Sequence, residues 1–194
     1  KKSPFTTEGS KDCRWKRLSG KVVFPKRLKQ TWLDYVNYRC LEMCCGEGPF
    51  LVSRYDTTTG EVIPIPDRIG ILDRKLRIVT ENIGTKPDEW LKHAILALKA
   101  TLGFEWQGDN LLLARENILY TMLEYYKFYC TDEPIDHATL LELADIISWN
   151  IWQMDGLKFV IPGSCVKTEH TDLLGEVTVE ECPGCKKRNY FTHN

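Results

Sequence analysis

The feature that most constrains the fold is an apolar run that breaks at two glycines and then resumes: Leu41-Glu42-Met43-Cys44-Cys45-Gly46-Glu47-Gly48-Pro49-Phe50-Leu51. The segment from Tyr38 to Cys45 is short and apolar, which predicts a buried strand, and Phe50 reopens an apolar segment that we expect to be a helix. Gly46 and Gly48 have no Cβ, so the backbone can turn sharply there and approach a ligand. Amides at the start of the following helix would attract polar or anionic groups. The stretch therefore predicts a strand, a glycine loop and a helix, a unit typical of sites for nucleotide-like ligands.

The rest of the chain alternates between patterns typical of strands and of helices. In chain order we expect strands at 22–24, 38–45, 104–106 and 149–154, and helices at 31–36, 85–102, 111–129 and 136–147. The segment 56–84 contains prolines and alternating apolar residues, which predicts a hairpin or an extended insertion. This order of elements predicts an α/β domain with a mostly parallel sheet over residues 22–163.

Three sequence features fall at the predicted carboxyl ends of the strands, where parallel sheets bind their ligands. They are the glycine loop, Glu105 and Asp155. A glycine loop after one strand and a carboxylate after the next is an arrangement that holds a ribose-bearing cofactor, because the carboxylate accepts hydrogen bonds from the two ribose hydroxyls. The alternatives are that Glu105 is a surface carboxylate and that Cys44 and Cys45 are small buried apolar side chains.

Three segments of the chain, in the same order, resemble the motifs of a known family. The Leu41–Leu51 stretch is similar to the cofactor motif Leu-Asp-Pro-Ala-Cys-Gly-Ser/Thr-Gly-Asn-Phe-Leu of adenine-specific, S-adenosylmethionine-dependent DNA methyltransferases of restriction–modification systems. Gly103-Phe104-Glu105 resembles the family's acidic motif. The segment 150–157, Asn-Ile-Trp-Gln-Met-Asp-Gly-Leu, resembles its next motif, Asn-Ile-x-x-Gly-Asp-x-Leu. The chain also looks like a group of bacterial and phage proteins labelled restriction subunit M.

The resemblance implies a Rossmann-like methyltransferase fold, S-adenosylmethionine as the cofactor and DNA adenine as the substrate. It implies that the two loop glycines pass close to the methionine part of the cofactor, that Glu105 holds the ribose and that Asp155 lies near the adenine. The cofactor-binding residues that it implies are Glu42, Cys44, Gly46, Gly48, Phe50, Glu105, Trp106 and Asp155. The partners that it implies are DNA and a further subunit of a restriction–modification system.

The chain departs from that family at the residues that carry out methyl transfer. The family's catalytic tetrapeptide, Asp/Asn/Ser-Pro-Pro-Tyr/Phe/Trp, is absent, because none of the nine prolines is adjacent to another. In that family the tetrapeptide binds the target amino group and stacks on the flipped base. Met154 also replaces the glycine of the third motif. The catalytic residues are therefore unknown, and the chain is either a fragment of an enzyme or a cofactor-binding homologue that has lost catalysis. Cytosine methylation is disfavoured, because no cysteine follows a proline.

The amino-terminal part of the chain is strongly basic. Residues 1–29 hold ten Lys/Arg and two Asp/Glu, a net charge of +8, whereas the remainder carries −9 and the whole chain −1. A basic arm over residues 1–21 is typical of segments that neutralise phosphates, which predicts DNA as a partner. Trp15 lies inside this arm and could stack on a base. The alternative is a solvated terminus, since charged chain ends are common.

The carboxyl-terminal segment 164–194 carries a cysteine motif. Cys182 and Cys185 have the two-residue spacing that lets both thiolates reach one Zn²⁺ from a tight turn. Cys165 with His193 or with His170, or a ligand beyond residue 194, would complete a tetrahedral zinc knuckle. The alternative is a glycine turn with two reduced cysteines. The eight cysteines do not resemble a small secreted disulfide framework, which favours reduced thiols.

The composition and the distribution of apolar residues limit the class of protein. No run approaches the roughly 18 apolar residues of a membrane span, and the first residues lack the apolar core of a signal peptide, so we expect a cytoplasmic protein with no membrane partner. The favoured hypothesis is an S-adenosylmethionine-dependent DNA adenine methyltransferase-like protein. The second is a non-catalytic module with the same fold that binds DNA or a partner. The third, methylation of a small molecule or a protein, receives no support from the third motif or the basic arm.

Overall fold

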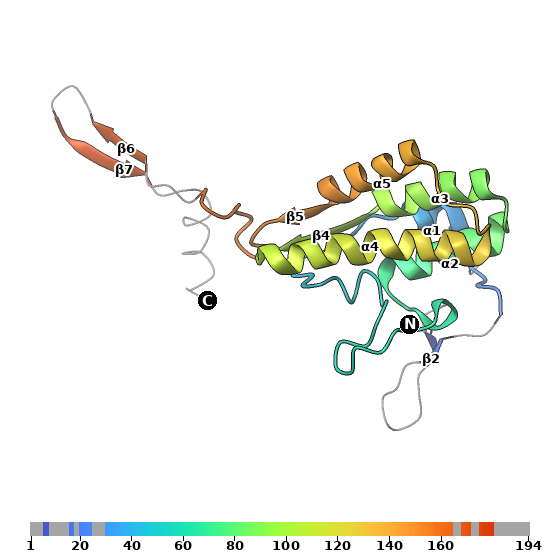
Figure 1. Ribbon diagram of the computed structural model, residues 1–194. Coiled ribbons are helices and arrows are strands. Elements are labelled where there is room, and N and C mark those ends of the chain that lie inside the picture. Colours follow the sequence, from blue (N-terminus) through green and yellow to red (C-terminus); the bar gives the residue numbers. More distant parts are fainter. Residues whose placement is uncertain are drawn as a thin grey trace.

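The computed structural model describes residues 6–7, 16–17, 20–24, 30–164, 168–171 and 175–180. The helices are α1 (Trp32–Asn37), α2 (Ile71–Ile83), α3 (Pro87–Lys99), α4 (Gly108–Tyr129) and α5 (His137–Asn150), with a 3₁₀ turn, η2 (Ile65–Asp67). The strands are β1 (Thr6–Thr7), β2 (Lys16–Arg17), β3 (Cys40–Glu42), β4 (Thr101–Glu105), β5 (Ile151–Gln153), β6 (Thr168–Thr171) and β7 (Val177–Glu180). Figure 1 shows α4 and α5 running alongside β4 and β5. The α/β class predicted from the sequence is confirmed.

The central sheet has the order β3-β4-β5, and both pairs of neighbours are parallel. Two helices connect β3 to β4, and two more connect β4 to β5, which satisfies the need of parallel strands for long crossovers. Since all three strands run in one direction, their carboxyl ends lie at one edge of the sheet. The glycine loop after β3, Glu105 at the end of β4 and Met154 after β5 therefore leave the sheet at the same edge.

Two strand predictions differ from the structure. The sequence pattern predicts a helix through residue 102 and a strand at 104–106, whereas α3 ends at Lys99 and β4 starts at Thr101. Gly103, which lies between the predicted helix and the predicted strand, is inside β4. A Cβ on Gly103 would lie 3.0 Å from Cδ1 of Leu51 and 3.1 Å from Sγ of Cys45, so this glycine allows the glycine loop to pack closely on the strand. The strand predicted at 22–24 is absent among these described residues.

The helix expected directly after the glycine loop is interrupted. Residues 48–52 form one helical turn, in which the Val52 amide donates to the Gly48 carbonyl (2.8 Å). The chain then leaves the turn and returns at Ile71, whose amide donates to the carbonyl of Phe50 (2.8 Å), so α2 continues that turn. The prediction of a hairpin or extended insertion over 56–84 is therefore wrong for 71–83, which are helical. The excursion spans 53–70 instead.

A buried carboxylate explains where this excursion begins and ends. Oδ2 of Asp73, in the first turn of α2, accepts hydrogen bonds from the Ser53 amide (2.7 Å) and from the Gly70 amide (3.0 Å). The Ser53 hydroxyl also donates to Asp73 and accepts from the Gly70 amide (both 3.2 Å). Burial raises the pKa of Asp73. Asp73 thus ties the two ends of the excursion together at the start of α2, a dependence that hydrophobic periodicity does not reveal.

Two arginines attach the excursion to α4. Oε1 of Glu124 accepts from Nε (2.9 Å) and Nη2 (2.7 Å) of Arg54, and Oε2 accepts from Nη1 of Arg68 (2.6 Å). The Arg68 side chain is 2 % exposed, and its Nε donates to the Ile63 carbonyl (2.9 Å). Burial opposes ionisation of Glu124, but the hydrogen bonds from the two arginines outweigh it and lower the pKa of this carboxyl. The excursion is therefore held as part of the domain.

Replacing Glu124 with glutamine should destabilise the fold by about 2 kcal/mol, because it leaves the buried Arg68 guanidinium without its carboxylate. The lowered pKa of Glu124 means that its contribution is complete above about pH 5 and is lost as the pH falls through the folded-state value. Urea unfolding of the wild type and the variant should show a gap in free energy at pH 7 that narrows at acid pH. Glu116→Gln, at an exposed position of α4, is the matched control. A pH-independent gap would contradict this assignment.

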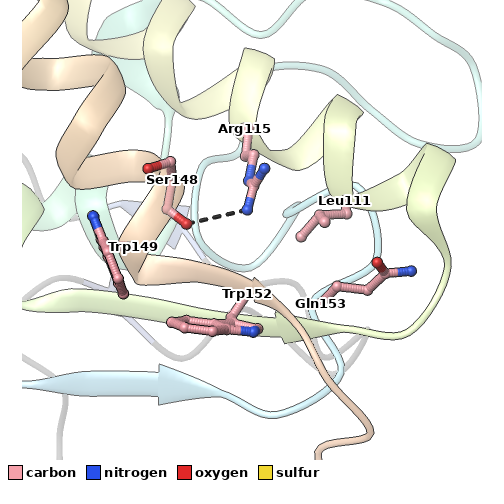
Figure 2. Close-up of a pocket in the computed structure, with 6 residues that line it drawn as sticks. All are labelled: Leu111, Arg115, Ser148, Trp149, Trp152 and Gln153. Carbon is pink, nitrogen blue, oxygen red and sulfur yellow. Dashed lines mark hydrogen bonds between the residues drawn. The ribbon is translucent and has the colours of Figure 1, made fainter. Parts of the chain in front are cut away.

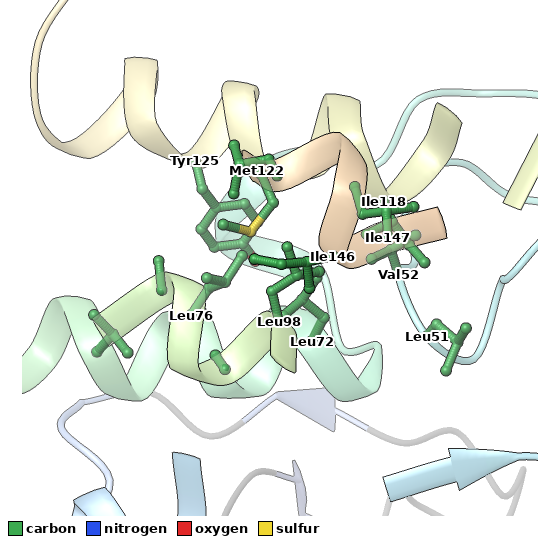
Figure 3. Packing of buried hydrophobic residues seen from close by; sticks show 14 of the residues in the cluster. Leu51, Val52, Leu72, Leu76, Leu98, Ile118, Met122, Tyr125, Ile146 and Ile147 are labelled. Carbon is green, nitrogen blue, oxygen red and sulfur yellow. The ribbon is translucent and has the colours of Figure 1, made fainter. Parts of the chain in front are cut away.

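The hydrophobic core lies among the helices and one face of the sheet. Figure 3 shows side chains of α2, α4 and α5 converging around Leu76 and Met122. Buried apolar side chains recur at helical spacing, among them Leu72, Leu76 and Val79 in α2, Trp90, Ala94 and Leu98 in α3, Ile118, Met122 and Tyr125 in α4, and Leu143, Ile146 and Ile147 in α5. This spacing is why α3, α4 and α5 were predictable from the sequence, whereas the same spacing in α2 was not recognised within the predicted insertion.

A buried lysine holds the opposite ends of the strands. Nζ of Lys75 donates to the carbonyls of Tyr38 (2.6 Å) and Ala100 (2.8 Å), which precede β3 and β4, and the Cys40 amide also donates to the Ala100 carbonyl (3.0 Å). Burial lowers the pKa of Lys75 to about 8. Lys75 therefore fixes the starting register of the two strands whose far ends carry the glycine loop and Glu105.

The two ends of the chain contribute short antiparallel pairs. β1 pairs with β2 inside the predicted basic arm, and β6 pairs with β7 inside the predicted cysteine-bearing segment. The residues after the arm dock on α2, since the Val22 amide donates to Glu81 (2.8 Å) and Arg77 donates to both Glu81 and the Gly20 carbonyl. Trp15 lies outside the described residues. Within the described part of the chain, no helix has the length and apolar character needed to cross a membrane.

Candidate cofactor site at the carboxyl ends of the strands

The glycine loop and Glu105 are joined by a direct hydrogen bond. Oε2 of Glu105 accepts from the Gly46 amide (2.7 Å), and Oε1 accepts from the Gln107 amide (2.9 Å). The Cys45 amide donates to the Phe104 carbonyl (2.8 Å), which continues the pairing of β3 and β4 into the loop. Glu105 is only 8 % exposed, so it is not the surface carboxylate of the alternative interpretation. The glycine loop and Glu105, which the sequence predicts to lie together at the strand ends, are therefore in direct contact.

Gly46 presents its backbone to open space. Its φ is +56°, in the region that favours glycine, and a Cβ at this position would meet no heavy atom within 4 Å. Each carboxylate oxygen of Glu105 accepts one backbone amide and keeps a further lone pair for another donor. Together they place an open backbone turn beside a buried acceptor, a combination that suits a ligand carrying hydroxyl groups.

The amides of the loop are arranged differently from the prediction. Gly48, at a φ of +85°, packs against Ala114 of α4, and its amide donates to the Cys45 carbonyl (2.8 Å). The amides of Leu51 and Val52 both donate to the Gly48 carbonyl. These amides are therefore used within the turn, and the expectation of free amides for an anion at this helix start is wrong for them. These three amides are therefore already paired and are not available to a phosphate.

Asp155 lies at the same edge of the sheet as Glu105, but its carboxylate accepts hydrogen bonds from its own turn. Oδ1 accepts from the amides of Leu157 and Lys158 (3.0 Å each), and the amide hydrogen bonds, led by that of Lys158, lower the pKa of Asp155. The next residue, Gly156, is buried so tightly that a Cβ would lie 1.8 Å from the carbonyl oxygen of Met43. The turn after β5 thus packs directly on the turn after β3, and all three predicted features share one region.

The other predicted cofactor-binding residues differ in how close they lie to the site. Glu42 is half-buried at the end of β3. Trp106, directly after the site carboxylate, is 49 % exposed and stands beside the strand ends. Phe50 is 70 % exposed, and only its backbone carbonyl takes part in the structure described above. The structure therefore brings Glu42 and Trp106 to the site and leaves Phe50 at the surface.

The two adjacent cysteines have opposite environments. Cys44 is exposed, whereas Cys45 is 2 % exposed, and burial, reinforced by the charge of Glu105, raises the pKa of the Cys45 thiol to about 12. Among the described residues, Cys40, Cys44, Cys45 and Cys130 are all free thiols. Cys45 is therefore an apolar packing residue against Gly103, as the alternative interpretation holds, but that interpretation is wrong for the exposed Cys44.

Iodoacetamide at pH 8 should modify Cys44 at least about 100-fold faster than Cys45 in the folded protein, because the attacking species is the thiolate and Cys45 is both buried and protonated. In urea the two thiols should react at similar rates. Mass spectrometry of the proteolysed protein would locate the label. Equal labelling of the pair under native conditions would show that the strand end is open.

The predicted zinc ligands cannot be placed together. Cys165, Cys182, Cys185 and His193 lie outside the described residues. His170 is exposed on β6, with Nε2 4.0 Å from Glu180 of β7. Within the described ranges, no group of three or more His, Cys, Asp or Glu side chains is arranged to hold a metal ion. Zinc stays a prediction.

Sequence reasoning missed the residues that support the loop from α4. The side-chain amide of Asn117 donates to the Glu47 carbonyl (3.0 Å) and to the Tyr55 hydroxyl (3.2 Å), and that hydroxyl in turn donates to the Glu47 carboxylate. Asn117, like Thr121 one turn later, is a buried polar residue among the mainly apolar buried residues of α4, and a buried polar side chain on a helix is the signal that marks it. Gly156 was also missed, although glycine after aspartate is typical of a tight turn.

Comparisons with protein-family models, with curated proteins and with solved structures find no match to this chain.

Proposed function

We propose that this chain forms the S-adenosylmethionine-binding part of a DNA adenine methyltransferase with a Rossmann-like methyltransferase fold. The observation that carries the proposal is the hydrogen bond between the Gly46 amide and Glu105 (2.7 Å), which sets a glycine turn and a buried carboxylate side by side beyond two neighbouring parallel strands. Three segments that resemble the family's motifs follow in the family's order, and the parallel order β3-β4-β5 is compatible with that fold.

The residues present fit this cofactor. Glu105 has lone pairs left for the two ribose hydroxyls, and the open backbone at Gly46 leaves room for the methionine part. Trp106 offers an exposed ring beside the position expected for the adenine. Asp155 fits less directly, because its Oδ1 is committed to its own turn and its Oδ2 lies 3.5 Å from Lys158. When bound, the cofactor supplies a methyl group on a sulfonium, whose in-line transfer depends mainly on positioning.

DNA is proposed as the substrate from two features of the sequence. The segment 150–157 resembles a motif of adenine-specific DNA enzymes, and the amino-terminal 29 residues carry a net charge of +8 that suits a phosphate backbone. No residue of this chain matches the catalytic tetrapeptide, so the group that holds the target base is proposed to come from further sequence or from a partner subunit. The cytoplasm is the proposed location.

A second candidate function is cofactor or DNA binding without methyl transfer. It is favoured by one specific observation, the lack of any Pro-Pro-aromatic sequence among the nine prolines. On this alternative the chain supports another subunit, and its affinity for DNA should fall steeply with salt because phosphate contacts release counterions.

A transfer assay distinguishes the two. The complete natural gene product is incubated with tritiated S-adenosylmethionine and unmethylated DNA, and the nucleosides are then separated. Label in N6-methyladenine that disappears in Glu105→Gln supports the enzyme. Cofactor binding with no label in DNA supports the non-catalytic module. Label in a protein or a small molecule instead of DNA would contradict both.

A further inference from the structure

A pocket lies along the edge of β5 that has no partner among the described strands, and one of its residues, Gln153, pairs with Glu105 of the strand-end site. It has a volume of about 400 Å³, within the range that holds small ligands. Figure 2 shows its lining: Leu111 and Arg115 from α4, Ser148 and Trp149 from α5, and Trp152 and Gln153 from β5. We call it the β5-edge pocket. None of its residues was predicted to bind a ligand.

Two indoles form the aromatic part of this pocket. Trp149 and Trp152 lie 5.5 Å apart between ring centroids at an angle of 62°, so they stand edge to face. Trp149 is 64 % exposed, whereas Trp152 is half-buried on the strand. An indole held in place by a neighbour while most of its surface faces solvent is an available stacking platform. The pocket therefore has a ready contact for a planar ring.

A fixed guanidinium forms the polar part. Nε and Nη2 of Arg115 donate to the Ile151 carbonyl (3.0 and 2.8 Å), and Nη2 also donates to the Ser148 carbonyl (3.1 Å). Both acceptors are uncharged carbonyl oxygens, and none of the ion pairs found among the described residues includes Arg115. Nη1 takes no part in these bonds. The guanidinium is thus held rigidly with its charge uncompensated, which suits an anionic group on a ligand.

We propose that the β5-edge pocket binds a planar aromatic ring carrying an anionic group, as in a nucleotide. The ring stacks on Trp149, and the phosphate accepts hydrogen bonds from Nη1 of Arg115. Gln153 donates through Nε2 to the Trp106 carbonyl (3.1 Å), which leaves its Oε1 to accept from the ring edge. The same chemistry occurs in a free mononucleotide and in single-stranded DNA. The proposal does not depend on cofactor binding at Glu105.

Indole signals of the ¹⁵N-labelled whole chain provide the test. Deoxyadenosine monophosphate should shift the signals of Trp149 and Trp152 and saturate at roughly millimolar concentration. Trp149→Ala should weaken binding about tenfold, since base stacking on an aromatic ring contributes on this scale. Phe128→Ala removes an aromatic of similar exposure outside the pocket and should leave the affinity unchanged. A deoxyadenylate octamer that binds more tightly identifies single-stranded DNA as the source, and equal affinity identifies the free nucleotide.

Three results would overturn the proposal. The first is no shift of either indole at about 10 mM nucleotide. The second is unchanged affinity in Trp149→Ala. The third is a shift confined to Trp106 that disappears in Glu105→Gln, because the nucleotide would then occupy the strand-end site. Loss of S-adenosylmethionine binding in Glu105→Gln with nucleotide binding retained would separate the two sites, so either can fail independently of the other.

Discussion

Gly156→Ala is expected to lower the free energy of unfolding by at least about 3 kcal/mol, or roughly 10 °C in melting temperature. The added Cβ would lie 1.8 Å from the Met43 carbonyl oxygen and 2.7 Å from its carbonyl carbon. Both are backbone atoms of the turn after β3, so no side-chain rotation relieves the clash. The turn after β5 must separate from the glycine loop, and affinity for S-adenosylmethionine should fall with it. Thermal and urea unfolding followed by circular dichroism would measure the loss.

Gly108→Ala is the matched control. A Cβ on Gly108, at the start of α4, would lie 3.8 Å from Nε2 of Gln153, an ordinary contact. We expect unchanged stability or a gain of up to about 0.5 kcal/mol, since alanine has the higher helix propensity. A Gly156→Ala protein as stable as the wild type would show that the two turns are not packed together, and would remove Asp155 from the site.

Glu105→Gln is expected to weaken binding of S-adenosylmethionine at least tenfold, about 1.4 kcal/mol. Glutamine keeps the shape of the side chain and one oxygen acceptor for either Gly46 or Gln107, but its amide group cannot accept from a ribose hydroxyl. The weaker hold on the loop adds to the loss. Calorimetric titration would give both dissociation constants, and unfolding curves would show how much of the change is structural.

Glu61→Gln, at an exposed position of the excursion, should bind the cofactor as tightly as the wild type. Equal affinity in Glu105→Gln and the wild type would mean that the carboxylate only braces the glycine loop. If Glu105→Gln loses affinity but keeps wild-type stability, the lost interaction is the one between the carboxylate and the ligand.

Much of the fold was predictable because local patterns and tertiary structure agree. Asp136 caps α5 through hydrogen bonds to the amides of Ala138 and Thr139, as its position before an apolar run indicates. The helix over 111–129 was predicted within three residues of α4, since its buried residues keep the helical period. The pairing of the glycine loop with Glu105 followed from the strand order alone.

The errors arose where distant contacts decide local structure. Gly103 resembles a helix stop, but its role is to admit Leu51 and Cys45 against β4. The excursion over 53–70 depends on Asp73, which accepts from Ser53 twenty residues earlier, and no local pattern encodes that bond. Apolar and polar residues alternate in Val177–Glu180, which is typical of a strand. The strand was not predicted, because only the neighbouring cysteine motif of this segment was interpreted.

Backbone NMR of the chain titrated with S-adenosylmethionine tests the central claim most directly. We predict that the amide signals of Gly46 and Trp106 shift and saturate, that S-adenosylhomocysteine displaces the cofactor, and that signals from β6 and β7 stay fixed. Saturation should occur in the micromolar range typical of a cofactor. The absence of any shift at Gly46 and Trp106 at about 1 mM S-adenosylmethionine would contradict the assignment of the strand ends as a cofactor site.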